Sequence, residues 1–180
     1  MKKMLLTLLL TTGVIIANAQ TEKGDWMVGG NLSLNTSGNN TEFSLTPDIG
    51  IFIINNLAFG GNLGFIYSKS GDANVTSFGI GPFLRYYFTT ARIRPILHGS
   101  LNFLSQKTKI TGLPSTTNNV TSYFLGGGAA IFISDQVSID AVLGYANSKI
   151  KNYGSNGGLA LNIGFQVYLL RNQMDKIRGK

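Results

Sequence analysis

Few residues in this sequence can do acid–base or nucleophilic chemistry. The single histidine, His98, lies near Ser100, and Asp140 could complete a hydrolytic Ser-His-Asp arrangement with them. The chain has no cysteine, and one histidine does not make a dedicated zinc site, so neither a metal nor a cofactor is expected. The glycine run at 126–128 precedes no predicted helix, which argues against a phosphate-binding loop. What His98 can do therefore depends on the elements that position it.

Four charged side chains form a second group, and their chemistry is electrostatic. Two cations and two carboxylates would share one layer if they face a common interior, with the histidine about one layer away. Charges in a narrow, dry interior must pair. The favoured interpretation is a salt-bridged plug that fixes register and blocks flow, and the alternative is a functional site. The residues of this predicted plug are Asp48, Arg85, Arg94, Asp140 and His98.

An alternation of apolar and small or polar residues runs through the chain after its first 25 residues. The clearest case is 157–169, where Leu159, Leu161 and Ile163 alternate with Ala160 and Asn162. A period of two predicts β-strands with one apolar and one polar face. Strands are predicted at 26–36, 43–52, 57–68, 77–88, 93–105, 121–133, 137–149 and 157–169.

The predicted connections alternate in length. Short links occur at 53–56, 89–92 and 134–136, whereas longer polar links occur at 37–42, 69–76, 106–120 and 150–156. Short turns at one end and long loops at the other are typical of a membrane barrel entered from the periplasm. The predicted fold class is all-β: an eight-stranded antiparallel up-and-down transmembrane β-barrel.

Alternation alone does not say which face points outward. A secreted lipocalin-like barrel would also have eight strands, with the apolar face inside around a ligand. A water-facing exterior, however, should be roughly a quarter to a third charged. The polar face here holds mainly Asn, Ser, Thr and Gly, and lysine is almost absent from it. This composition favours a narrow lumen filled by small side chains.

Aromatic residues on the apolar face give a second argument for a membrane. They gather near both ends of the predicted strands and leave an aliphatic band between them. Two such rings are the interfacial girdles of membrane barrels. The predicted girdle residues are Phe43, Tyr67, Phe78, Phe103, Tyr123 and Tyr145 near the long loops, and Trp26, Phe59, Tyr86 and Phe88 near the short turns.

The first residues form a predicted secretory signal peptide at 1–19. Lys2 and Lys3 precede an apolar run, and 17–19 reads Ala-Asn-Ala, a small-residue cleavage site. The run is shorter than the roughly 20 residues of a membrane-spanning helix. The predicted barrel domain covers 20–169, and a short basic periplasmic tail covers 170–180. Only 13% of the residues are charged, compared with about 25% in a typical soluble domain.

Several phrases in the sequence resemble a known family. These are the strand-turn-strand phrase at 47–60, with Asn55-Asn56 at its turn, and the phrases at 81–88 and 126–133. They are similar to the "outer membrane protein beta-barrel domain" group, of the OmpA-barrel and OmpX type. The resemblance covers nearly the whole mature chain. It implies a location in the outer membrane of a Gram-negative bacterium, reached by export through the periplasm and insertion by the barrel assembly machinery.

The long loops are the predicted place of function, because loops on a rigid scaffold usually carry it. Their cations could bind the anionic phosphates of lipopolysaccharide. No basic stripe with interleaved aromatic residues occurs, so nucleic acid is not an expected partner. The loop cations are Lys69, Lys107, Lys109, Lys149 and Lys151.

The favoured function is non-enzymatic. The prediction is a plugged barrel with a structural or surface-interaction role, in contact with outer-membrane lipids and lipopolysaccharide and with a possible extracellular partner through its loops, chiefly 106–120. Three alternatives stay open: a narrow channel for small solutes, a secreted lipocalin-like binding barrel, and a lipid-modifying enzyme of the outer membrane.

Overall fold

The computed structural model describes residues 21–37, 40–150 and 154–171. The predicted signal peptide and most of the predicted basic tail lie outside these residues. Within the described residues, no helix is long and apolar enough to cross a membrane. They form eight strands: β1 (Trp26–Ser37), β2 (Asn40–Ile54), β3 (Leu57–Ser70), β4 (Ala73–Tyr87), β5 (Ile93–Ile110), β6 (Thr116–Ser134), β7 (Val137–Ile150) and β8 (Gly154–Leu169).

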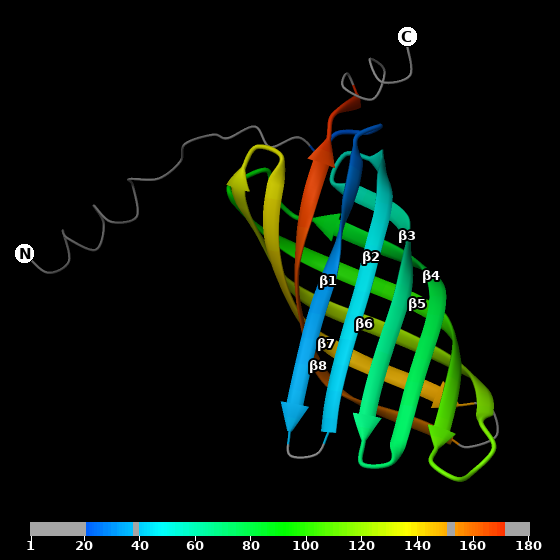
Figure 1. The fold of residues 1–180 in the computed structure, drawn as a ribbon. Helices are drawn as coiled ribbons and strands as arrows, with labels where there is room; N and C mark the ends of the chain where they lie inside the picture. The colour runs from blue at the N-terminus through cyan, green and yellow to red at the C-terminus, as the bar shows by residue number, and fades with distance from the viewer. Residues whose placement is uncertain (1–20, 38–39, 151–153, 172–180) are drawn as a thin grey trace, which may run out of the picture.

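The strands form a closed antiparallel barrel in sequence order, β1 to β8, which confirms the predicted fold class (Figure 1). Each strand therefore pairs with its neighbours along the chain, and β1 also pairs with β8. The start of β1 and the end of β8 lie at the same end of the barrel, beside the β2–β3, β4–β5 and β6–β7 turns (Figure 1). In a membrane barrel the short turns and the termini face the periplasm. This end is called the turn end below.

Alternation along each strand sorts the side chains as predicted. On β4, Phe78, Ile80 and Leu84 are 59%, 61% and 47% exposed, whereas Arg85 and Phe83 are 3% and 2% exposed. Over the middle of the strands the exposed set is mainly apolar, which is the reverse of a soluble protein and the pattern of a wall that faces lipid, whereas exposed polar residues such as Lys107 lie toward the end opposite the turns. The polar parity faces the lumen. The barrel is therefore oriented apolar face outward.

The predicted long loops are wrong in their extent. Residues 106–110 continue β5 and residues 116–120 continue β6, and Lys107 pairs with Thr117 across them, so only 111–115 connect these strands. The predicted loop at 69–76 shrinks in the same way to Gly71 and Asp72. Alternation signals a strand only where one face meets lipid. Beyond the bilayer both faces are polar, and the backbone ladder continues without that signal.

Prolines interrupt the ladder without shifting it. Between β2 and β3 the register has no pair at Thr46 and Pro47, and between β4 and β5 it has none at Gly81 and Pro82. The same register resumes on the far side of each interruption. Proline has no N–H to donate to a ladder, which accounts for both gaps.

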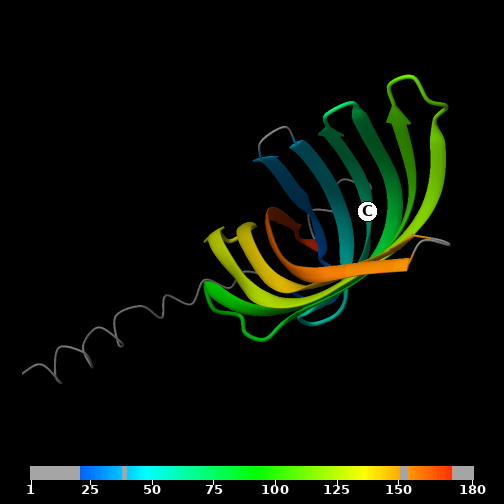
Figure 2. The ribbon, with the colours of Figure 1, turned by 90° about the horizontal axis from the view of Figure 1, so that it is seen from below.

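The seam between β1 and β8 is short. In the described part of the chain these strands pair through six residues each, Trp26 to Asn31 against Leu169 to Gly164. Every other neighbouring pair is joined over at least twelve residues of each strand. Farther from the turn end, β8 runs away from β1, and the wall is open on that side when viewed along the barrel (Figures 1 and 2). The open part belongs to the half of the barrel away from the turn end.

We expect hydrogen exchange to divide β8 into two halves. Residues 164–167 pair with both β1 and β7, whereas residues 154–163 pair only with β7. Local opening is easier where fewer backbone hydrogen bonds hold a segment, so the 154–163 half should exchange faster. Hydrogen–deuterium exchange with mass spectrometry on the barrel in lipid nanodiscs measures this. Equal protection along all of β8 would show that the seam is fully paired in the membrane.

Candidate functional site: the closed lumen

A salt bridge crosses the lumen in its turn-end half. The Arg85 guanidinium on β4 reaches the Asp140 carboxylate on β7, with Nη1 and Oδ2 2.6 Å apart and both side chains 4% exposed. The Nε–H of Arg85 also donates to Nδ1 of His98 on β5, at 3.2 Å. Alternation turns each of these residues inward, and the antiparallel register of β4 and β5 places Arg85 opposite His98. The structure thus brings three of the predicted plug residues together.

Hydrogen bonds continue from Asp140 toward the turn end. Its Oδ1 accepts from the Ser138 hydroxyl at 2.6 Å, and Ser138 Oγ lies 3.0 Å from the Tyr168 hydroxyl. The Tyr168 hydroxyl lies 3.0 Å from that of Tyr87. A continuous chain of polar contacts therefore runs from His98 to Tyr87 through the interior. Charged and polar groups this deeply buried are stable only when they are paired in this way.

The other two predicted plug residues have different partners. Asp48 accepts a hydrogen bond from the Gln166 amide, Nε2 to Oδ2, at 3.1 Å. Arg94 lies closer to the turn end, where its guanidinium donates to the carbonyls of Ala91 and Thr90 and to the Thr21 hydroxyl. The expected single layer of four charges is thus spread over two levels. The reason is that Arg94 follows the β4–β5 turn at once, so its side chain bonds the carbonyls of that turn.

Aromatic rings fill the lumen between the salt bridge and the turn end. Phe52, Tyr87, Phe132 and Tyr168 are all 2% exposed or less, and their ring centroids lie 4.9 to 6.3 Å apart in contacting pairs. The Arg94 guanidinium stacks on the Phe132 ring at 4.1 Å, a cation–π contact that ties the two levels together.

The N-terminal segment, residues 21–25, covers the turn-end opening of the lumen next to these rings. The backbone N–H of Gly24 donates to the Phe52 carbonyl at 2.9 Å, and the N–H of Phe52 donates to the Asp25 carbonyl at 2.9 Å. The Asp25 carboxylate in turn accepts from the backbone N–H of Arg171 at 3.0 Å. Thr21 and Asp25 are only 3% and 4% exposed. The turn end of the lumen is therefore sealed by side chains and by the chain itself.

Sequence reasoning missed the aromatic layer and the N-terminal segment. The signal for the rings was present, because Phe52 shares parity with Asp48, and Tyr87 shares parity with Arg85. That face was predicted to hold small and polar side chains, so these rings were not predicted to fill the lumen. No signal in the sequence points to Thr21 and Asp25, which precede the first strand and bond to residues distant in the chain.

Three buried oxygens near the salt bridge lack a donor. Among the described residues these are Oδ1 of Asp48, Oδ1 of Asn62 and Oε1 of Gln166. Asp48 pairs with Asn62 across β2 and β3, so the oxygens line one spot of the lumen. The spot is rich in acceptors and suits a small hydrogen-bond donor such as water, and it repels anions. The described residues contain no group of three His, Cys, Asp or Glu side chains that could hold a metal ion.

The geometry does not assemble a hydrolytic triad. In a triad the histidine Nδ1–H donates to the aspartate, and here Nδ1 of His98 instead accepts from Arg85. The two oxygens of Asp140 bind Ser138 and Arg85. His98 also packs between the Phe83 and Phe124 rings, with centroids 5.6 and 6.0 Å away. The arrangement holds positions and provides no base for a nucleophile.

The predicted girdle residues lie on the outer wall. Eight of the ten are 37 to 59% exposed, and Trp26 and Phe43 are half-buried. Three contacts stand out among the outer aromatic rings: Phe43 with Phe65, Tyr86 with Phe88, and Tyr123 with Tyr145, at centroid distances of 6.4, 5.0 and 6.4 Å. Phe88 follows the end of β4 and belongs to the turn that leads to β5.

Lysines gather on the outer wall at the end opposite the turns. Lys69 on β3 and Lys109 on β5 both pair with Asn74 on β4, and Lys107 pairs with Thr76 on the same strand. Lys107 and Lys109, with Tyr67 and Phe78, line a groove of about 500 Å³. Lys149 lies apart on β7, and Lys151 lies outside the described residues. We call Lys69, Lys107 and Lys109 the lysine patch.

Several solved structures have the same architecture. Neisserial surface protein A (NspA) matches with a TM-score of 0.57 and 20% identity over 79% of this chain and 94% of NspA. The N-terminal β-barrel domain of Pseudomonas aeruginosa OprF matches with a TM-score of 0.56 and 11% identity over 82% and 98%. A major outer membrane protein of Thermus thermophilus matches with a TM-score of 0.51 and 12% identity over 81% and 99%. These likenesses show the fold.

The fold and its outward apolar face define a transmembrane β-barrel. A family model described as "Outer membrane protein beta-barrel domain" matches residues 5–170, and the chain belongs to this family. No curated protein matches the sequence at a significant level. The protein is located in the outer membrane, as predicted, and the secreted lipocalin-like alternative is thereby wrong.

We expect removal of one member of the Arg85–Asp140 pair to destabilise the barrel more than removal of both. Arg85→Met leaves a buried, unpaired carboxylate and should lower the free energy of unfolding by about 3–5 kcal/mol. Arg85→Met combined with Asp140→Leu removes both charges and should restore most of that loss. Urea unfolding, followed by the mobility of unboiled protein in SDS gels, measures both.

Lys149→Met is the matched control for this experiment, because it removes an exposed cation by the same chemical change. It should shift the free energy of unfolding by no more than about 0.5 kcal/mol. A single Arg85→Met variant as stable as the control would show that the salt bridge does not hold the lumen together.

Proposed function

We propose that this protein is a non-conducting, non-enzymatic structural barrel of the outer membrane that interacts with the cell surface through its outer end. The observation that carries the proposal is the closed lumen. The Arg85–Asp140 bridge spans the interior. The rings of Tyr87 and Tyr168 lie between it and the turn end, and the N-terminal segment lies between the rings and the periplasmic opening. Eight strands leave an interior just wide enough for side chains, so these groups suffice to block passage of solutes.

The lysine patch supports a specific surface interaction. Lys69 and Lys109 flank Asn74 across three neighbouring strands, which places their backbones about 9–10 Å apart at the usual strand spacing. Two acidic residues lie near the patch, Asp72 in the β3–β4 turn and Glu42, which lines the inner cavity, so the patch carries an excess of positive charge. Tyr67 and Phe78 line the wall below them. Phosphate groups above acyl chains match this order of charge and apolar surface, and in the outer leaflet lipopolysaccharide presents both.

The β5–β6 hairpin is the part of the barrel best placed for an extracellular partner. These strands are 18 and 19 residues long, the longest strands in the described part of the chain. At their outer end Leu113 and Ile110 are 63% and 43% exposed, and this small apolar group offers a contact for a protein partner. This part of the proposal replaces the predicted long loop by a rigid, two-stranded projection.

We expect the folded protein to be silent in planar lipid bilayers. The sealed lumen offers no continuous aqueous path, so refolded protein should give no discrete conductance steps. A porin of 16 strands, added to the same bilayers, controls for insertion, and the heat-dependent mobility shift controls for folding. Reproducible steps from folded protein would instead favour the alternative of a narrow channel for small solutes.

We expect Lys107→Gln combined with Lys109→Gln to weaken binding to lipopolysaccharide. Each surface lysine near anionic lipid contributes about 1 kcal/mol, so two together should weaken binding by about 30-fold at low salt. Flotation of the barrel with lipopolysaccharide-containing vesicles measures the binding. Lys23→Gln with Arg92→Gln, at the turn end, is the matched control. Unchanged binding of the patch variant, or equal binding to dephosphorylated lipopolysaccharide, would contradict the proposed contact.

A further inference from the structure

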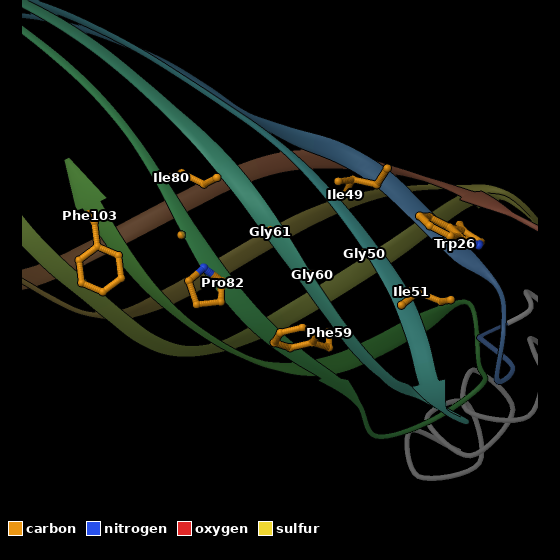
Figure 3. Close-up of a pocket in the computed structure, with 11 residues that line it drawn as sticks. Trp26, Ile49, Gly50, Ile51, Phe59, Gly60, Gly61, Ile80, Pro82 and Phe103 are labelled. Carbon is orange, nitrogen blue, oxygen red and sulfur yellow. The ribbon is translucent and has the colours of Figure 1, made fainter. Parts of the chain in front are cut away.

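An apolar groove indents the outer wall over β1 to β5 and runs from Trp26 at the turn end to Ile80 and Phe103 at the middle of β4 and β5 (Figure 3). Its volume is about 510 Å³, within the range of ligand pockets in proteins. Almost all of its exposed lining is apolar. Trp26, Ile51 and Phe59 border one end, Ile80 and Phe103 border the other, and Gly61 lies between them.

The groove exists because the wall lacks a side chain at Gly61. Parity directs this position outward, between Phe59 and Leu63 on β3. A Cβ added there would have Gly81 O, at 3.7 Å, as its nearest neighbour, so the space above the glycine is open. On the flanking strands Gly61 pairs with Ile49 and with Pro82, whose compact ring does not cover it. The hollow is therefore fixed by the rigid sheet and does not depend on a mobile side chain.

We propose that this groove holds one acyl chain of a glycerophospholipid from the periplasmic leaflet. The groove is continuous with the exposed apolar residues that face the bilayer, such as Leu63 and Leu84, so hydrocarbon is what reaches it. The position of its turn-end border in the bilayer indicates which leaflet supplies the chain. Ile51 and Phe59 lie only a few residues from the β2–β3 turn, and Trp26 begins β1 at the same end. Tryptophan at such a position lies at the level of the lipid headgroups.

Packing is the source of the affinity. Inside a bilayer apolar burial gives no gain over lipid, so binding depends on close contact with a shaped surface. A fixed, shallow hollow bordered by aromatic rings lets one chain contact more of the wall than a chain on the convex wall elsewhere does. The groove is lined by no charged side chain, and its border at Ile80 and Phe103 adjoins the wall next to the lysine patch. Gly61→Leu changes no lysine, so the lipid site can be tested separately from the proposed binding of lipopolysaccharide.

Trp26 provides a direct test, because it is the only tryptophan in the sequence and borders the groove. The full mature protein is reconstituted in vesicles of diphytanoyl phosphatidylcholine, whose branched chains fit the groove poorly, with increasing fractions of straight-chain phosphatidylcholine brominated on its acyl chains. Preferred occupancy of the groove by the straight chains should quench Trp26 at lower fractions of brominated lipid than random contact predicts. The expected relative association constant is about three- to ten-fold above that of bulk lipid, the size of other packing contacts within bilayers.

Gly61→Leu fills the groove and should return the relative association constant to about that of bulk lipid. Gly127→Leu is the matched control, since this glycine also faces outward, has its nearest neighbour at 3.7 Å, and lies on β6 away from the groove. Native mass spectrometry adds a readout that does not depend on Trp26. One retained phospholipid is expected on the wild type and on Gly127→Leu, and none on Gly61→Leu. Wild-type quenching at the random-contact level, or equal lipid retention by all three proteins, would overturn the proposal.

Discussion

The structure depends on one requirement of the bilayer: every backbone N–H and C=O in the hydrocarbon region must find a partner within the protein. A sheet meets this requirement only when its two edges meet, and β1 and β8 meet through the pairs from Trp26–Leu169 to Asn31–Gly164. Closure then dictates what each face of the wall carries. The outer face must be apolar because it touches lipid, and the inner face must be small or paired because eight strands enclose little space.

The interior of this barrel solves the second condition differently at its two ends. At the turn end, aromatic rings and the Arg85–Asp140 bridge fill the space, and the polar atoms are paired from His98 to Tyr87. At the other end a cavity of about 460 Å³ is lined by serines, aliphatic side chains and Glu42. The filled half supplies rigidity, and the open half presents hairpins to the surroundings. Rigidity and contact with partners are thus assigned to opposite ends of one sheet.

Much of this architecture could be predicted from the sequence, because the bilayer imposes a period of two on every strand it contains. The eight strands follow from that period, their order follows from the short connections, and the outward face follows from the small, nearly lysine-free polar parity. Prediction failed where the bilayer stops. Lys107 and Thr117 are paired strand residues, but both faces of their strands are polar, so they were predicted as loop. The partners of Arg94 could not be predicted either, since parity gives the direction of a side chain and not the turn carbonyls that it reaches.

The requirement for pairing also bears on the open seam. Continuing the β1–β8 register by one step would place Leu32 opposite Ile163, and both residues are exposed on the outer wall. The register therefore extends without exchanging the inner and outer faces, which a slip of one residue would do. Unpaired backbone in contact with lipid is costly, so the bilayer favours further pairing of these edges, whereas water at the cell surface does not. The pairing of β1 with β8 therefore depends more directly on contact with lipid than the pairing of the other strands, which are joined over at least twelve residues.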